Sequence, residues 1–120
     1  MGDRHGLRRL QRAVSDGLEL GREGYLDWPA TLESLNTIAA AGVPVTLAPA
    51  RRAASGRLSL TAEGSDAHLR IDGEHGLTVD TEKFRGGWRS RSTRPQQWIL
   101  DLDLGERRTV QIRVPADPAA

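Results

Sequence analysis

WILDLDLGERRTVQIRV, residues 98–114, is the stretch that decides the fold class. Apolar and polar residues alternate on both sides of a polar centre around Gly105, Glu106 and Arg107. Such alternation is typical of a β-strand with one buried face, because successive side chains point to opposite faces of a sheet. The apolar members are Trp98, Leu100, Leu102 and Leu104, then Val110, Ile112 and Val114. An odd connection of about three or five residues keeps both apolar sets on one face, so the stretch predicts an antiparallel hairpin.

A second hairpin is predicted before it, over residues 57–72. The loop at residues 63–66 places Leu60 opposite Leu69 and Leu58 opposite Ile71. On the reverse face, the same register gives three polar pairs: Arg57 with Asp72, Ser59 with Arg70, and Thr61 with His68. Opposite charges therefore meet in a register chosen from the apolar residues alone, which supports that register.

Three further segments complete the predicted sheet. Val45 and Leu47 lie between two prolines, which suits an edge strand because proline has no N–H to donate. Residues 77–81 alternate after a glycine-containing turn, and residues 83–98 have the pattern of extended chain. The sequence therefore predicts a curved antiparallel meander sheet of about five or six strands over residues 45–114.

Two helices are expected before the sheet. The first, over about residues 4–20, depends on apolar residues at helical spacing, although arginines crowd its N-terminal end, where the helix dipole disfavours them. The second, over residues 27–42, has recognisable signals at both ends. These signals are Asp27, Pro29, Gly42 and Pro44. Tyr25 and Trp28 are expected to cover the joint between the two helices, since aromatic rings supply large buried area.

Together these elements predict an α+β fold. Two N-terminal helices, within residues 4–42, would cover one face of the sheet, because a sheet with one apolar face needs a cover. The length of 120 residues fits a single domain. Residues 115–120 are expected to form a short disordered tail.

Composition removes several classes of protein. The chain has no cysteine, which excludes disulfide frameworks, thiolate metal sites and cysteine nucleophiles. No apolar stretch approaches the roughly 18 residues of a bilayer-spanning helix, and the first residues lack the apolar block of a secretory signal. A soluble, cytoplasmic protein without a cofactor and without membrane association is therefore expected. The 17 basic and 16 acidic residues nearly balance, which argues against a highly cationic packaging protein.

The most unusual segment is KFRGGWRSRSTRPQQW, residues 83–98, in which basic residues and aromatic rings interleave with no acid between them. Single-stranded nucleic-acid binders combine rings that stack on bases with cations that follow phosphates. The candidate binding residues are Lys83, Arg85, Trp88, Arg89, Arg91 and Arg94. At a period of two, however, the cations up to Arg91 share one face while Phe84, Gly86 and Trp88 share the other. An ordinary strand with its rings in the core and its arginines in water has the same pattern.

Other polar groupings have simple structural explanations. Asp101 and Asp103 share a strand face, as a pair of Mg²⁺ ligands would, but alternation with leucine is the usual sign of a solvent face. His68 and Asp72 project from one face of a predicted strand, near Ser59, and no nucleophile motif accompanies them. No catalytic residue and no metal ligand is therefore assigned.

Three functions remain open. The first is a non-catalytic binding or adaptor module that engages a protein partner or a second copy through an arginine-rich sheet face or edge. The second is a protein that binds single-stranded nucleic acid or another anionic, phosphate-bearing ligand. The third is a small cofactor-free isomerase or cyclase with an apolar pocket between helices and sheet, lined by Trp28, Trp88 or Trp98. The burial of Trp88 and Trp98 separates these hypotheses.

Overall fold

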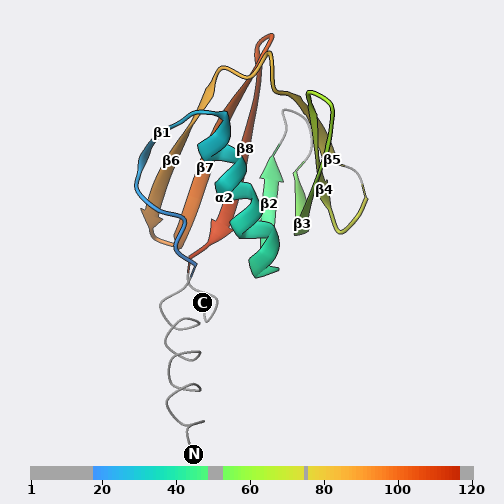
Figure 1. The fold of residues 1–120 in the computed structure, drawn as a ribbon. Helices are drawn as coiled ribbons and strands as arrows, with labels where there is room; N and C mark the ends of the chain where they lie inside the picture. Colours follow the sequence, from blue (N-terminus) through green and yellow to red (C-terminus); the bar gives the residue numbers. More distant parts are fainter. Residues whose placement is uncertain (1–17, 49–52, 75, 117–120) are drawn as a thin grey trace, which may run out of the picture.

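The computed structural model describes residues 18–48, 53–74 and 76–116, which form one helix and one eight-stranded antiparallel sheet (Figure 1). The helix, α2 (Trp28–Ala41), lies across one face of the sheet, called here the inner face; the opposite side is the outer face. The strands are β1 (Gly24–Leu26), β2 (Pro44–Ala48), β3 (Ala54–Glu63), β4 (Asp66–Ile71), β5 (Gly76–Asp80), β6 (Gly86–Thr93), β7 (Gln96–Gly105) and β8 (Arg108–Pro115).

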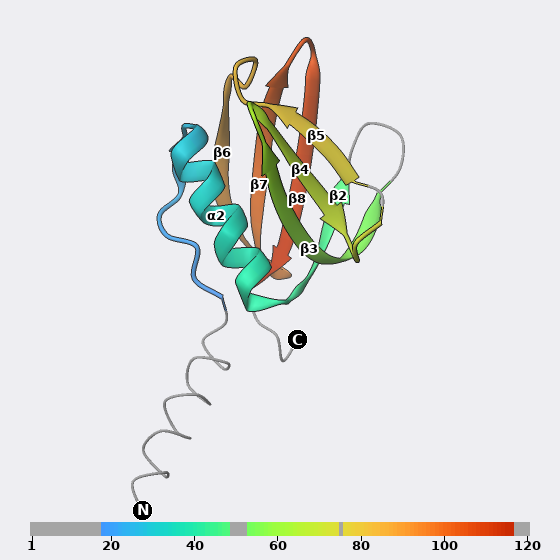
Figure 2. The ribbon, with the colours of Figure 1, turned by 45° about the vertical axis from the view of Figure 1, so that its right-hand side comes forward.

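The strand order is β1-β6-β7-β8-β2-β3-β4-β5. Two meanders, β2 to β5 and β6 to β8, therefore lie side by side and join where β8 pairs with β2. The sheet curves strongly, so that β3, β4 and β5 stand forward of the plane of β6 to β8 (Figure 2). It does not close, because β1 and β5 remain its two edges.

The α+β fold with an antiparallel sheet is confirmed, but the details of the predicted sheet need correction. The sheet has eight strands rather than five or six. It is not one meander, because β2 pairs with both β3 and β8. The extra edge strand, β1, has only three residues, which is too short for alternation to be visible in the sequence.

The ends of α2 are as predicted. The Asp27 carboxylate accepts a hydrogen bond from the Ala30 N–H at 2.9 Å, and Pro29 occupies the first turn, where an N–H has no helical acceptor. Gly42 ends the helix in the left-handed conformation, with a φ of 67°, and its N–H donates to the carbonyl groups of Ile38 and Ala39.

One helix, not two, is present in the described part of the chain. Most of the expected first helix falls on residues 1–17, which lie outside the described residues. Its last three residues, 18–20, are described and are not helical. The N–H of Leu18 donates to the Ala116 carbonyl at 3.2 Å rather than to a carbonyl of a preceding helical turn. At the other terminus, Pro115 belongs to β8 and Ala116 is buried, so packing extends to residue 116. The rest of the expected tail, residues 117–120, lies outside the described residues.

Both predicted hairpins are present: the register predicted for β3 and β4 is confirmed, and the apolar residues of β7 and β8 share one face as predicted. In the β3–β4 hairpin, Leu58 faces Ile71 and Leu60 faces Leu69, and Ser59 faces Arg70 and Thr61 faces His68 as predicted. Arg57 and Asp72 meet just beyond this register: the Arg57 N–H donates to Asp72 Oδ1 at 2.9 Å, and the Asp72 N–H donates to the Arg57 carbonyl at 2.8 Å. In the β7–β8 hairpin, the regular pairs are Trp98 with Val114, Leu100 with Ile112, and Leu102 with Val110. Regular pairing ends at Asp103 and Thr109. Beyond it, a bulge between Asp103 and Gly105 shifts the register, and Gly105 then pairs with Arg108 across the turn.

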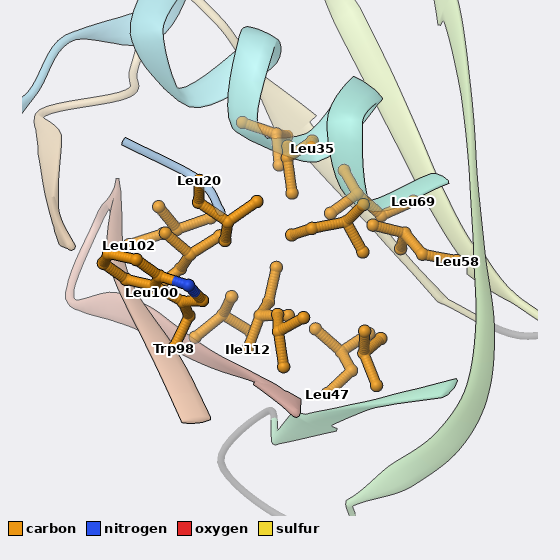
Figure 3. Packing of buried hydrophobic residues seen from close by; sticks show 14 of the residues in the cluster. Leu20, Leu35, Leu47, Leu58, Leu69, Trp98, Leu100, Leu102 and Ile112 are labelled. Carbon is orange, nitrogen blue, oxygen red and sulfur yellow. The ribbon is translucent and has the colours of Figure 1, made fainter. Parts of the chain in front are cut away.

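The core fills the space between α2 and the curved sheet (Figure 3). Leu35 and Ile38 of the helix are fully buried against inward side chains of the strands. The labelled residues come from α2, from both meanders and, in the case of Leu20, from the segment before β1: Leu20, Leu35, Leu47, Leu58, Leu69, Trp98, Leu100, Leu102 and Ile112. Trp98 is 2% exposed, so this tryptophan fills the core rather than lining a pocket.

Candidate functional site

Arg89 and Arg91, two of the candidate binding residues, point to the inner face. Arg89 donates from Nε to the Arg22 carbonyl at 2.7 Å and from Nη1 to Ser34 Oγ at 2.8 Å, so it ties β6 to the helix. The Arg91 guanidinium lies 3.6 Å from a Glu19 carboxylate oxygen and 5.2 Å from the centre of a Trp98 ring. Both arginines are therefore engaged within the protein.

Lys83 and Arg94 lie away from these arginines. Lys83 precedes β6 in a turn, and its Nζ lies 2.7 Å from Glu106 Oε1. The hydrogen bond to Glu106, together with its charge, raises the pKa of Lys83, and the same hydrogen bond lowers the pKa of Glu106. Arg94 is exposed in the turn between β6 and β7.

This ion pair gives a pH-dependent prediction. Because the pKa of Glu106 is lowered in the folded state, its contribution is present above the ordinary value near 4.5 and is lost as pH falls through the lowered value. The raised pKa of Lys83 makes the contribution fade again in strong alkali. We expect Glu106→Gln to lower the urea midpoint slightly at pH 7 in low salt, and to leave it unchanged in strong acid. An equal loss at both pH values would contradict this assignment.

Trp88 lies on the outer face, opposite to the inward arginines of its own strand. The interpretation with rings in the core and arginines in water is therefore wrong for β6. Alternation separates Trp88 from Arg89 and Arg91 as predicted, but the arginine side of β6 is the one that faces α2, where Arg89 bonds to a serine of the helix. The predicted alternation also does not extend back through Gly86, because Phe84 packs against the core while Trp88 is exposed. Within β6, Trp88 points outward while Arg89 and Arg91 point inward.

Trp88 belongs to a row of side chains that crosses five strands of the outer face. The strand registers place Tyr25 beside Trp88, Trp88 beside Asp101, and Asp101 beside Gln111. Ala48 of β2 continues the row beyond Gln111. We call these five residues the outer row. Tyr25 was expected to cover a joint between two helices; instead it stands on the edge strand β1.

An open depression of about 700 Å³ follows the outer row. Its second row of lining residues is formed by Gly86, Asp103 and Thr109, which are also cross-strand neighbours. Arg85 lines the same depression. We call this site the outer depression. The surface is hollowed here because two of the lining residues, Gly86 and Ala48, have no side chain or a small one.

Two aromatic rings stand at one end of the outer depression. Tyr25 is 65% exposed and Trp88 is 54% exposed, and these are the exposed large hydrophobic residues of the described chain. Gly86 makes room for the tyrosine: a Cβ atom there would lie 2.6 Å from Cε2 of Tyr25. The ring therefore lies against the backbone of β6 beside Trp88.

Polar groups occupy the floor and the other end of the outer depression. Gln111 donates from Nε2 to Asp101 Oδ1 at 2.9 Å, and its own oxygen accepts from Arg113 Nε at 2.7 Å. Asp103 Oδ1 accepts from the Gly105 N–H at 3.0 Å. These bonds hold both carboxylates in defined positions beside the rings.

Comparison with protein families, curated proteins and solved structures found no match. Within residues 18–48, 53–74 and 76–116, no three His, Asp or Glu side chains gather closely enough to hold a metal ion. The described helix is too short to span a membrane.

Of the six predicted binding residues, the structure brings Arg85 and Trp88 together at the outer depression. Tyr25, Gln111 and Gly86 are not among the predicted binding residues, and the sequence pattern favours a plain solvent-facing position for Asp101 over a ligand site. A signal for Tyr25 does exist: in Gly24-Tyr25-Leu26 an exposed ring precedes a buried leucine, as in a short strand.

Proposed function

We propose that the protein is a non-catalytic binding module that holds a partner protein at the outer depression. The observation that supports this function is the exposure of Tyr25 and Trp88, side by side on adjacent strands and next to a depression with fixed polar groups. Tyrosine and tryptophan dominate the energetic centres of protein interfaces, because each brings a large rigid surface with a polar end. Tryptophan is highly buried on average in folded proteins, so the 54% exposure of Trp88 is unusual.

The other two functions have less support from the same observations. Arg89 and Arg91, which the nucleic-acid hypothesis needs as phosphate ligands, make hydrogen bonds, an ion pair and a cation–π contact inside the protein. The isomerase hypothesis needs an apolar pocket between helix and sheet. That space contains Leu35, Ile38 and Leu100, none of which is exposed at all.

Selection from a library of random 12-residue peptides tests this function. The full chain is immobilised as bait, and peptides that bind the Trp88→Ala variant equally well are removed. We expect peptides with micromolar dissociation constants that lose at least about tenfold in affinity on Trp88→Ala or Tyr25→Ala, as for residues at the centre of an interface. Thr61→Ala, at an exposed position of β3, serves as the matched control and should leave the affinity unchanged.

Two results would overturn the proposal. One is a selection in which no recovered peptide distinguishes the wild type from Trp88→Ala. The other is tight binding of a fluorescein-labelled 15-nucleotide deoxythymidine strand that weakens steeply with salt, because that behaviour reports phosphate contacts.

A further inference from the structure

The aromatic rings of the outer depression are suited to a cation. The face of a tryptophan or tyrosine ring attracts a guanidinium or ammonium group, with arginine the commoner partner in proteins. This protein already contains one such contact at Trp98, where the Arg91 guanidinium lies 5.2 Å from the ring centre. That cation belongs to the inner face, whereas the rings of Tyr25 and Trp88 stand open on the outer face.

Two carboxylates lie within reach of the same rings. Asp101 is the direct neighbour of Trp88 across β6 and β7, and Asp103 is one outward position further along β7. Among the described residues, neither carboxylate forms an ion pair; the ion pairs found there involve Glu19, Glu63 and Glu106. Both carboxylates accept hydrogen bonds from uncharged donors, Gln111 and the Gly105 N–H.

The balance of charge in the outer depression is negative. Its lining residues include two carboxylates and one guanidinium, that of Arg85. Arg113 lies outside the lining, where its Nε donates to Gln111. A second cation entering beside Trp88 would therefore bring the depression closer to neutrality.

From these contacts we infer that the partner presents an arginine side chain to the outer depression, stacked on Trp88 and Tyr25 and facing Asp101. This inference rests on the proposed function and names the partner chemistry of the same site. Arginine fits better than lysine because its planar guanidinium stacks on a ring and at the same time donates two parallel hydrogen bonds to a carboxylate. Neighbouring strands lie about 4.8 Å apart, so one guanidinium spans the step from Trp88 to Asp101.

The test uses two peptides that differ only in charge. Each has nine residues, a Gly/Ser background and blocked ends, with either arginine or citrulline at positions 3, 5 and 7. Citrulline keeps the planar shape and most of the donors of arginine but carries no charge. Each peptide is titrated into the ¹⁵N-labelled full chain, and the Trp88 indole N–H signal, identified from Trp88→Phe, is followed by NMR.

We expect the arginine peptide to shift the Trp88 signal and to bind about tenfold more tightly than the citrulline peptide. Asp101→Asn should weaken the arginine peptide several-fold and leave the citrulline peptide unchanged. Glu33→Gln, which removes an exposed carboxylate from α2, is the matched control and should have no effect. Higher salt should weaken the arginine peptide alone.

The outcomes separate this inference from the proposed function. Equal binding of both peptides, or an arginine peptide that does not respond to Asp101→Asn, overturns the arginine inference and leaves a binding face in place. The arginine inference is also overturned, and the binding face kept, if the library peptides that depend on Trp88 contain no excess of arginine. A library without Trp88-dependent peptides overturns the proposed function itself.

Discussion

Trp98→Ala is expected to remove about 3–5 kcal/mol of the free energy of unfolding, the usual cost of deleting a large buried aromatic side chain. Trp98 is 2% exposed and is the largest buried side chain of the core cluster. Its indole N–H also donates to the Leu18 carbonyl at 2.8 Å, so the substitution leaves that carbonyl without its partner. Since small domains are stable by only about 5–15 kcal/mol, the variant should be close to unfolding at room temperature.

The same substitution at Trp88 is the matched control. Trp88 is 54% exposed, so Trp88→Ala should cost about 1 kcal/mol or less. Both variants are measured by urea denaturation followed by circular dichroism, because the substitutions change the tryptophan fluorescence itself. Trp98→Phe, which keeps a ring but loses the N–H, should lie between wild type and Trp98→Ala. Equal losses at positions 88 and 98 would contradict the assignment of one ring to the core and the other to the surface.

The hairpins were predictable because their information is local. In the β3–β4 hairpin, alternation selects the faces and the short turn selects the register, so Leu60 must meet Leu69. The ends of α2 are local as well, since Asp27 bonds to a residue three positions later. The pairing of β8 with β2 was not predictable, because the two strands lie far apart in sequence and the residue pattern of a strand does not indicate which distant strand it pairs with.

The binding site was harder to predict than the fold, because contacts between residues far apart in sequence decide which face of the sheet its side chains point to. Alternation places Trp88 and Arg89 on opposite faces but does not say which face receives the helix. Arg89 points inward because Ser34 and the Arg22 carbonyl, 55 and 67 positions away, accept its hydrogen bonds. The outer row likewise exists only after the strand order is known, because its residues come from five strands.

Gly86→Ala should damage both stability and binding, because Gly86 is the position that lets Tyr25 lie beside Trp88. The glycine has a φ of 137°, which residues with a side chain rarely adopt. An added Cβ would also lie 2.6 Å from Cε2 and 3.0 Å from the hydroxyl oxygen of Tyr25. We expect a loss of about 2–3 kcal/mol in the free energy of unfolding, from backbone strain and steric conflict together. The arginine peptide should bind about tenfold more weakly, since the tyrosine must leave the outer row.

Two controls divide that loss into its causes. Gly64→Ala has open space around the new Cβ and a positive φ of 61°, which side chains tolerate better than the φ of 137° at Gly86, so it sets a lower bound on the backbone strain and should cost about 1 kcal/mol. In the Tyr25→Ala background, Gly86→Ala should cost less than in the wild type, because the ring it would meet is absent. A Gly86→Ala variant no less stable than Gly64→Ala, and with unchanged peptide affinity, would contradict this role of Gly86. If Gly86→Ala does cost less stability in the Tyr25→Ala background than in the wild type, the two positions are coupled. The short edge strand β1 and the glycine at the start of β6 then together hold the tyrosine in the binding site.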